Sequence, residues 1–250
     1  SGNARRTDRV GKKRSVGTEP LEERLLLSGT PVVLNALVIN PDNQAQYTNA
    51  TGGLVVTSGQ LAGKDALVIE GISVSTSAGD AISVNLSGIA LKRLAIETVT
   101  VSQYTNLGVN INLTNVTGME SIALEDIVTT GTKRGLSLTL NNTDTNALTI
   151  DDSTFPGVTV TATNGADIHN GVVTGNKISA PAGVEGFMLN VISTSTTMST
   201  ANNFQVIDNV QITTLDRDAV QVNATGYYNP TTRLTTSNLD GLNISNNKVG

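Results

Sequence analysis

The chain has 250 residues, a net charge of −5, 38% hydrophobic residues, 3% aromatic residues, and neither Cys nor Trp. It is too apolar and too weakly charged to be disordered throughout. The lack of Cys excludes disulfides, thiolate catalysis and zinc–thiolate sites. No uninterrupted apolar run approaches the about 20 residues that a membrane helix needs, so we predict no membrane span.

The charges are divided unevenly along the chain. Residues 1–28 carry seven Lys or Arg and four acids, whereas the remaining 222 residues carry nine bases and seventeen acids. An acidic body that is poor in aromatic residues argues against nucleic acid as a partner, since that ligand favours basic surfaces and stacking side chains. We therefore interpret residues 1–30 as a disordered basic leader.

The leader contains a short sequence with a known parallel. Residues 20–29 read Pro-Leu-Glu-Glu-Arg-Leu-Leu-Leu-Ser-Gly. This segment resembles the LEPR-XLL element at the N-terminus of large exported repeat proteins of planctomycete-type bacteria, although Glu23 stands where that element has Pro. The resemblance implies a sorting or processing signal, and a secreted or cell-surface bacterial protein. The alternative is a short helical patch within a disordered arm.

The rest of the chain repeats. Seven Gly or Asp residues, spaced 22 to 32 residues apart, each begin a segment in which apolar and polar residues alternate. Alternation with β-branched residues predicts strands. The clearest are residues 82–86, 109–113, 136–140, 158–162 and 220–224. A second strand follows in each repeat, at residues 67–72, 94–99, 122–127, 148–152, 204–209 and 242–249, with a poorer copy at 172–178.

Short strands in repeats of about 27 residues predict a parallel β-solenoid, in which stacked turns bury a continuous apolar column. Leu67, Leu94, Ile122 and Leu148 should then touch, and so narrow a core needs no Trp or Phe. A string of immunoglobulin-like sandwiches would repeat every 90–100 residues or so instead.

The repeat resembles the right-handed parallel β-helix of pectate-lyase-like proteins, most closely at residues 148–152 and 242–249. We predict an all-β fold with about seven such turns over residues 53–250. Residues 31–52 would form an N-terminal cap or an irregular first turn. Because no cap follows the last strand, we expect further turns of the same chain beyond Gly250.

Alternation also predicts which side chains point outward. On the first strands these are hydroxyls and amides, which can form hydrogen-bonded ladders, contact sugar hydroxyls or, less fittingly, bind ice. The candidate carbohydrate-binding residues are Asn85, Asn110, Asn112, Thr139, Thr159 and Thr161.

On the second strands the outward residues include acids at equivalent positions. Glu70, Glu97, Glu125 and Asp151 would form a column of neighbouring carboxylates. Like charges this close repel, so they either extend into water or share a cation, and calcium suits several oxygen ligands. The candidate calcium ligands are Glu97, Glu125, Asp126, Asp151 and Asp152.

The sequence gives weaker support for catalysis. The pectate-lyase-like resemblance implies acids beside an Arg or Lys, which Asp151 and Asp152 with Lys133 and Arg134 could supply, whereas His169 lacks the flanking glycines of the related hydrolases. We therefore favour a non-catalytic, structural or adhesive segment that contacts polysaccharide or cell-envelope components. The alternative is a polysaccharide lyase or glycoside hydrolase.

Overall fold

The computed structural model describes residues 34–76, 78–194, 196–229, 231, 234–236 and 238–250. Residues 34–250 form one compact unit. The predicted leader and its LEPR-XLL-like element lie outside the described residues.

The first of two large sheets is parallel and has seven strands. Strands such as β5, β7 and β9 alternate β-branched or Leu residues with small polar residues, so one face can be buried while the other meets solvent. In spatial order the strands are β2 (Leu54–Thr57), β5 (Ile82–Ser87), β7 (Val109–Thr114), β9 (Leu136–Asn141), β12 (Val158–Thr163), β16 (Phe187–Ile192) and β20 (Val220–Thr225).

The second large sheet is also parallel and has twelve strands. Its main path is β1 (Ala36–Ile39), β3 (Ala66–Glu70), β6 (Arg93–Ser102), β8 (Ser121–Thr130), β10 (Ala147–Asp151), β14 (Gly171–Thr174), β18 (Phe204–Ile207) and β24 (Asn243–Ser245). Beside this path lie β4 (Ser73–Ser75), β11 (Thr154–Phe155), β15 (Lys177–Ala180) and β19 (Gln211–Thr214).

The remaining elements are short. A three-stranded parallel sheet contains β13 (Asp167–Ile168), β17 (Thr200–Asn202) and β23 (Leu239–Asp240), while β21 (Tyr227–Asn229) and β22 (Leu234–Thr236) form an antiparallel pair. Two 3₁₀ helices, η1 (Gln44–Tyr47) and η2 (Ser58–Leu61), follow β1 and β2. Among the described residues, no helix has the length and apolar character to cross a membrane.

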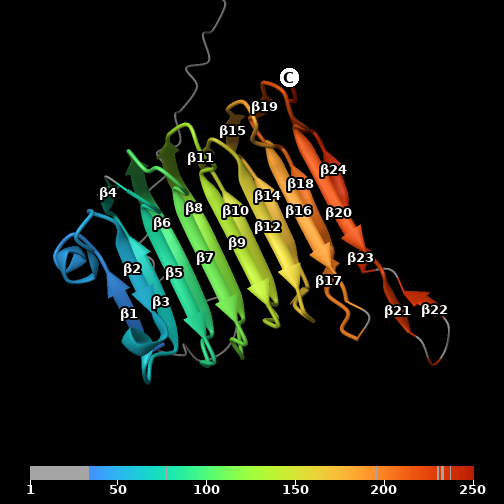
Figure 1. Ribbon diagram of the computed structural model, residues 1–250, viewed down its shortest axis with the longest axis horizontal. Helices are drawn as coiled ribbons and strands as arrows, with labels where there is room; N and C mark the ends of the chain where they lie inside the picture. The colour runs from blue at the N-terminus through green and yellow to red at the C-terminus, as the bar shows by residue number, and fades with distance from the viewer. Residues whose placement is uncertain (1–33, 77, 195, 230, 232–233, 237) are drawn as a thin grey trace, which may run out of the picture. The chain divides into compact units, whose positions relative to one another are not determined.

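The chain alternates between the two large sheets. From β2 to β9, each strand of the seven-stranded sheet is followed in sequence by a strand of the twelve-stranded sheet. After β12, β16 and β20, strands of the small sheets come first, and the chain then returns to the twelve-stranded sheet at β14, β18 and β24. In Figure 1 the colours run in order from one side of both sheets to the other. Equivalent strands of successive repeats therefore lie side by side. The fold is therefore all-β with parallel sheets, and β1 joins the twelve-stranded sheet next to β3.

The predicted register of the core is confirmed. Leu67 pairs with Leu94, Leu94 with Ile122, and Ile122 with Leu148, and all four side chains are buried. The same alternation buries Ile82, Val109, Leu136, Val158 and Phe187 on the seven-stranded sheet. Burial of these aliphatic columns between the sheets supplies the main favourable free energy of folding.

One expectation about the core was wrong. We expected an interior too narrow to need Phe, but Phe155, Phe187 and Phe204 are all fully buried. The ring centroids of Phe187 and Phe204 lie 6.2 Å apart, within the range of favourable aromatic pairs. Gly171 makes room for one of these rings, since a Cβ at this position would overlap the ring of Phe204.

Candidate functional site

The outward side chains of six strands of the seven-stranded sheet, β5 to β20, form what we call the polar face. It consists of Ser83, Asn85, Ser87, Asn110, Asn112, Thr114, Ser137, Thr139, Asn141, Thr159, Thr161, Thr163, Met188, Asn190, Ile192, Gln221, Asn223 and Thr225. Within it, one row runs in register across six strands: Asn85, Asn112, Thr139, Thr161, Asn190 and Asn223. Five of the six predicted carbohydrate-binding residues are exposed or half-buried on this face, and the exception is Thr159.

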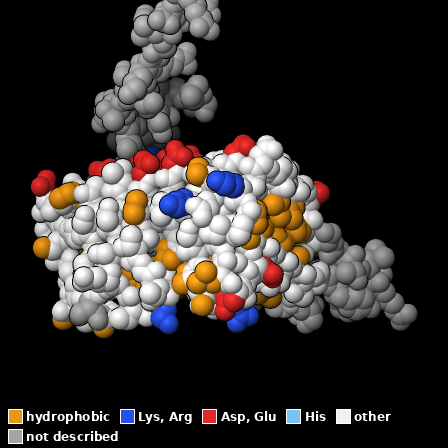
Figure 2. Space-filling model, turned by 90° about the horizontal axis from the view of Figure 1, so that it is seen from above, with side chains coloured by type: hydrophobic (Ala, Val, Ile, Leu, Met, Phe, Trp, Pro, Cys, Tyr) orange, Lys and Arg blue, Asp and Glu red, His pale blue; other side chains and the backbone are white. Residues whose placement is uncertain are grey.

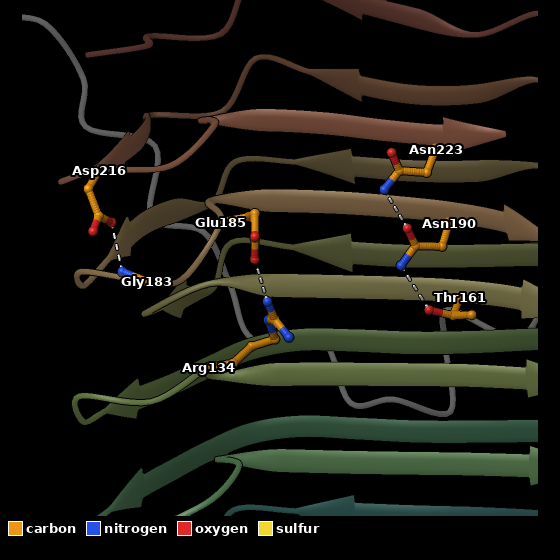
Figure 3. Close-up of polar contacts among 7 residues, drawn as sticks. All are labelled: Arg134, Thr161, Gly183, Glu185, Asn190, Asp216 and Asn223. Atoms are coloured by element: carbon orange, nitrogen blue, oxygen red, sulfur yellow. Dashed lines mark hydrogen bonds and ion pairs between the residues drawn. The ribbon is translucent and has the colours of Figure 1, made fainter.

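Hydrogen bonds connect neighbouring side chains at the two ends of this row. Asn112 Nδ2 donates to Asn85 Oδ1 at 2.9 Å. At the other end of the row, Asn223 Nδ2 donates to Asn190 Oδ1 at 2.8 Å, and Asn190 Nδ2 donates to Thr161 Oγ1 at 3.3 Å (Figure 3). The predicted ladder therefore exists at both ends of the row, where it orients the amide groups. Among the described residues, no side-chain hydrogen bond joins Thr139 to Asn112 or to Thr161, so the ladder is interrupted at β9.

Thr159 corrects one of the predicted binding residues. Its side chain is only 7% exposed, and its Oγ1 has no hydrogen-bond partner among the described residues. On the neighbouring strand the outward position in register with it is Met188, a longer side chain than the Ser, Thr and Asn residues that make up most of the face. Thr159 therefore offers no accessible hydroxyl to a ligand.

An ion pair lies beside the polar face, just before the strands β9 and β16 begin. Arg134 and Glu185 are 51 residues apart, yet their side chains meet at 2.7 Å and are only 25% and 20% exposed. Figure 3 shows this pair to one side of the Thr161–Asn190–Asn223 row. Among the described residues, the ion pair of Arg134 is with Glu185, and none joins Arg134 to Asp151 or Asp152.

The acid column on the twelve-stranded sheet has the predicted register. Glu70, Glu97, Glu125 and Asp151 occupy successive paired positions. The column is partly neutralised, since Arg93 donates to Glu97 Oε1 at 2.9 Å, with both side chains largely buried.

Asp151 lies in the most acidic part of the column. Burial raises the pKa of its carboxyl, and the nearby charges of Asp152 and Asp126 raise this pKa further. The backbone N–H of Asp152 donates to Asp151 Oδ1 at 2.9 Å, and this hydrogen bond acts in the opposite direction by lowering the pKa. Within the described part of the chain, no three carboxylate or imidazole groups converge in the manner of a metal site, so the geometry adds no support to the calcium hypothesis.

Sequence reasoning missed a group of side chains at the bends that follow β7 and β9. Asn115 and Asn142 occupy equivalent positions with φ values of 53° and 48°, and they line a pocket with Asp144. The available signal was an Asn directly after each of two successive strands, since Asn adopts left-handed backbone conformations more readily than most residues.

The two outer faces therefore differ in charge. No described outward residue from β5 to β20 on the polar face is charged, whereas the acids of the twelve-stranded sheet align. Figure 2 shows Asp and Glu side chains gathered in a row along one edge of the molecule. No protein-family model, curated protein or solved structure matches the chain.

Proposed function

We propose that the described repeats wind into a right-handed parallel β-helix of about seven turns. The seven strands of one sheet and their alternation with strands of the other sheet support this winding. Right-handedness is supported by general chain geometry, because crossovers between parallel strands of one sheet are right-handed in about 98% of cases.

On this architecture we base a function: a non-catalytic, structural or adhesive segment of a large exported bacterial protein that contacts polysaccharide. The observation that carries the proposal is the polar face, where uncharged amides and hydroxyls stand in register over six strands. Sugar hydroxyls both donate and accept hydrogen bonds, so fixed amides suit them. The leader resemblance supports a secreted or cell-surface location.

The charge pattern favours an uncharged polysaccharide. No Lys or Arg is among the residues of the polar face, and the neighbouring Arg134 is already paired with Glu185. The acid column gives the opposite sheet a negative charge. An acidic polymer would therefore meet repulsion without a compensating ion pair. Neutral glucans, xylans and mannans are the expected class.

The test is binding and turnover on a panel of neutral and acidic polysaccharides. We expect retention on at least one neutral polymer and no release of unsaturated or reducing products. Thr161→Val together with Asn190→Leu, on the polar face, should weaken binding about tenfold or more. Thr149→Val provides the matched control, because Thr149 is a half-buried outward residue on β10 of the other sheet. Absence of binding to every polymer would refute the proposal.

One observation favours an enzyme as the second candidate. Asp151 has a raised pKa and lies beside Asp126 and Asp152, and a carboxyl with a raised pKa beside another carboxylate is typical of glycoside hydrolases. Under this alternative, the same panel would yield new reducing ends or unsaturated products. Asp151→Asn would then abolish turnover while leaving polysaccharide binding intact.

A further inference from the structure

We infer that the pocket formed by Asn115, Val116, Thr117, Gly118, Asn142 and Asp144 is a binding site for a single neutral sugar ring. Its volume is about 250 Å³, just below the roughly 300–1,000 Å³ of pockets for larger ligands, so it suits one small ring. This inference rests on the proposed function and assigns a separate subsite within it.

The walls of the pocket are two bends from successive repeats. Thr114 pairs with Asn141, which places the next residues, Asn115 and Asn142, at equivalent positions. Asn142 Nδ2 donates to Asn115 Oδ1 at 2.6 Å, and both residues have left-handed backbone conformations. This bond fixes the orientation of the two amides before any ligand arrives.

The remaining polar atoms of the pocket form a mixed set. Three polar groups of the pocket make no hydrogen bond to another described residue: Asn115 Nδ2, Asn142 Oδ1 and the Thr117 hydroxyl. Asp144 uses Oδ1 to accept the backbone N–H of Asp167 at 3.0 Å, which leaves Oδ2 for a ligand. A donor, two acceptors and a hydroxyl in one small pocket match vicinal sugar hydroxyls, because each hydroxyl can both donate and accept.

The pocket is closed on one side by the core and open on the other. Val116 is buried in the hydrophobic core, so the surface that a ligand would contact is polar. Gly118 opens onto free space, since a Cβ there would meet no atom within 4 Å.

The charges of the residues that line the pocket determine which chemical class of sugar it can bind. Neither Lys nor Arg lines the pocket, and Asp144 is its one acid. A uronate or a sugar phosphate would bring a second negative charge to Asp144 without a cation to balance it. A neutral hexose avoids this repulsion, and its hydroxyls can donate to the Asp144 carboxylate in charge-assisted hydrogen bonds.

The experiment titrates the full chain with methyl glucoside, methyl galactoside and methyl mannoside, and with glucuronate as the charged counterpart. Binding is followed by the side-chain amide signals of Asn115 and Asn142 in ¹H–¹⁵N NMR spectra. We expect at least one neutral methyl hexoside to shift both signals and to bind at least tenfold more tightly than glucuronate.

Variants then separate the pocket from the rest of the surface. Asn142→Gly keeps a residue suited to positive φ but removes the amide, and Asp144→Ala removes the acceptor. Each should weaken hexoside binding at least tenfold. Asn203→Gly makes the matched change at another left-handed Asn outside the pocket, with φ 53°, and should leave affinity unchanged. Circular dichroism of each variant verifies folding.

The outcomes distinguish this inference from the proposed function. If polysaccharide binds but neutral hexosides leave the Asn115 and Asn142 signals unmoved, or if the pocket variants bind hexoside as the parent does, the subsite is refuted and the proposed function stands. If hexosides bind in the pocket but no polysaccharide is retained, the polymer-binding function fails and the subsite stands.

Discussion

Asn176 and Asn209 lie one above the other in the interior, where Asn176 Nδ2 donates to Asn209 Oδ1 at 3.0 Å. Asn209 Nδ2 continues the series to Asn247 Oδ1 at 2.7 Å. Asn176 is fully buried and Asn209 is 2% exposed. Both amides also donate to backbone carbonyls, of Ile150 and Val173 respectively, so this interior amide column joins successive repeats through side-chain and backbone contacts.

Replacing Asn209 with Ala should destabilise the protein strongly. The change removes the acceptor of both the Asn176 backbone N–H and its Nδ2 group, which then remain buried and only partly paired. We expect the free energy of unfolding to fall by about 2–4 kcal/mol. Urea denaturation measures the change. Asn223→Ala on the polar face is the control and should cost under about 1 kcal/mol; equal losses for the two variants would contradict the account.

The contact between Gly171 and Phe204 gives a second prediction. Gly171→Ala places a methyl group against the ring of Phe204 and should cost about 1–3 kcal/mol. Phe204→Leu removes part of that ring, so the double variant should lose less stability than the sum of the single variants. Gly59→Ala, in open space on the surface, is the control and should be nearly neutral. Strict additivity in the double-mutant cycle would exclude the proposed steric contact.

The raised pKa of Asp151 predicts the pH dependence of stability. Because the folded-state pKa lies above the unfolded value, the folded protein favours the protonated carboxyl. The titration of Asp151 therefore contributes stability to the folded protein at pH values below the unfolded-state pKa. This contribution is lost as the pH rises through the folded-state pKa. Asp151→Asn, which stays neutral, should therefore raise the melting temperature at about pH 7 and lose this advantage near pH 3.

Calorimetry of the parent and Asp151→Asn across this pH range provides the measurement. Asp42→Asn, at an exposed position on the loop before η1, is the matched control for removal of a negative charge. A stabilising effect of Asp151→Asn that is equally large at both pH values would show that the effect does not come from titration of this carboxyl.

The Arg134–Glu185 pair should contribute a modest, salt-dependent stability. Glu185→Gln keeps the shape but removes the charge, and we expect a loss of about 0.5–1.5 kcal/mol because both side chains are largely buried. High salt should reduce the difference only in part. Asp65→Asn at the exposed Lys92–Asp65 pair, 3.9 Å long, is the comparison and should cost much less. A larger loss of stability for Asp65→Asn than for Glu185→Gln would contradict the expected contribution of the Arg134–Glu185 pair.

The sequence predicted the repeating strands because alternation depends only on local residue order. Ile82 and Val109, for example, begin predicted strands that the structure pairs residue for residue. The interior amide column escaped prediction, since an Asn within a polar repeat gives the same local pattern whether it faces solvent or pairs inside. The burial of Thr159 also depends on the neighbouring repeat, where Met188 occupies the paired position.

The pocket could be predicted only in part. The repeated Asn after β7 and β9 was a signal for left-handed bends that our sequence-based predictions did not use. The spacing between the strand ends and the orientation of Asp144 depend on the packing of β13 next to these bends. The resemblance-based expectations, including the sorting element and the surface location, concern properties that strand packing does not determine. They remain predictions.

The most direct test of the central claim is a titration of isotope-labelled protein with a soluble neutral polysaccharide. The side-chain amide signals of Asn85, Asn112, Asn190 and Asn223 report on the polar face one residue at a time. The account predicts that these signals shift together and saturate, while the amide of Asn243 on the opposite sheet stays in place. Binding that leaves all four unmoved would contradict it.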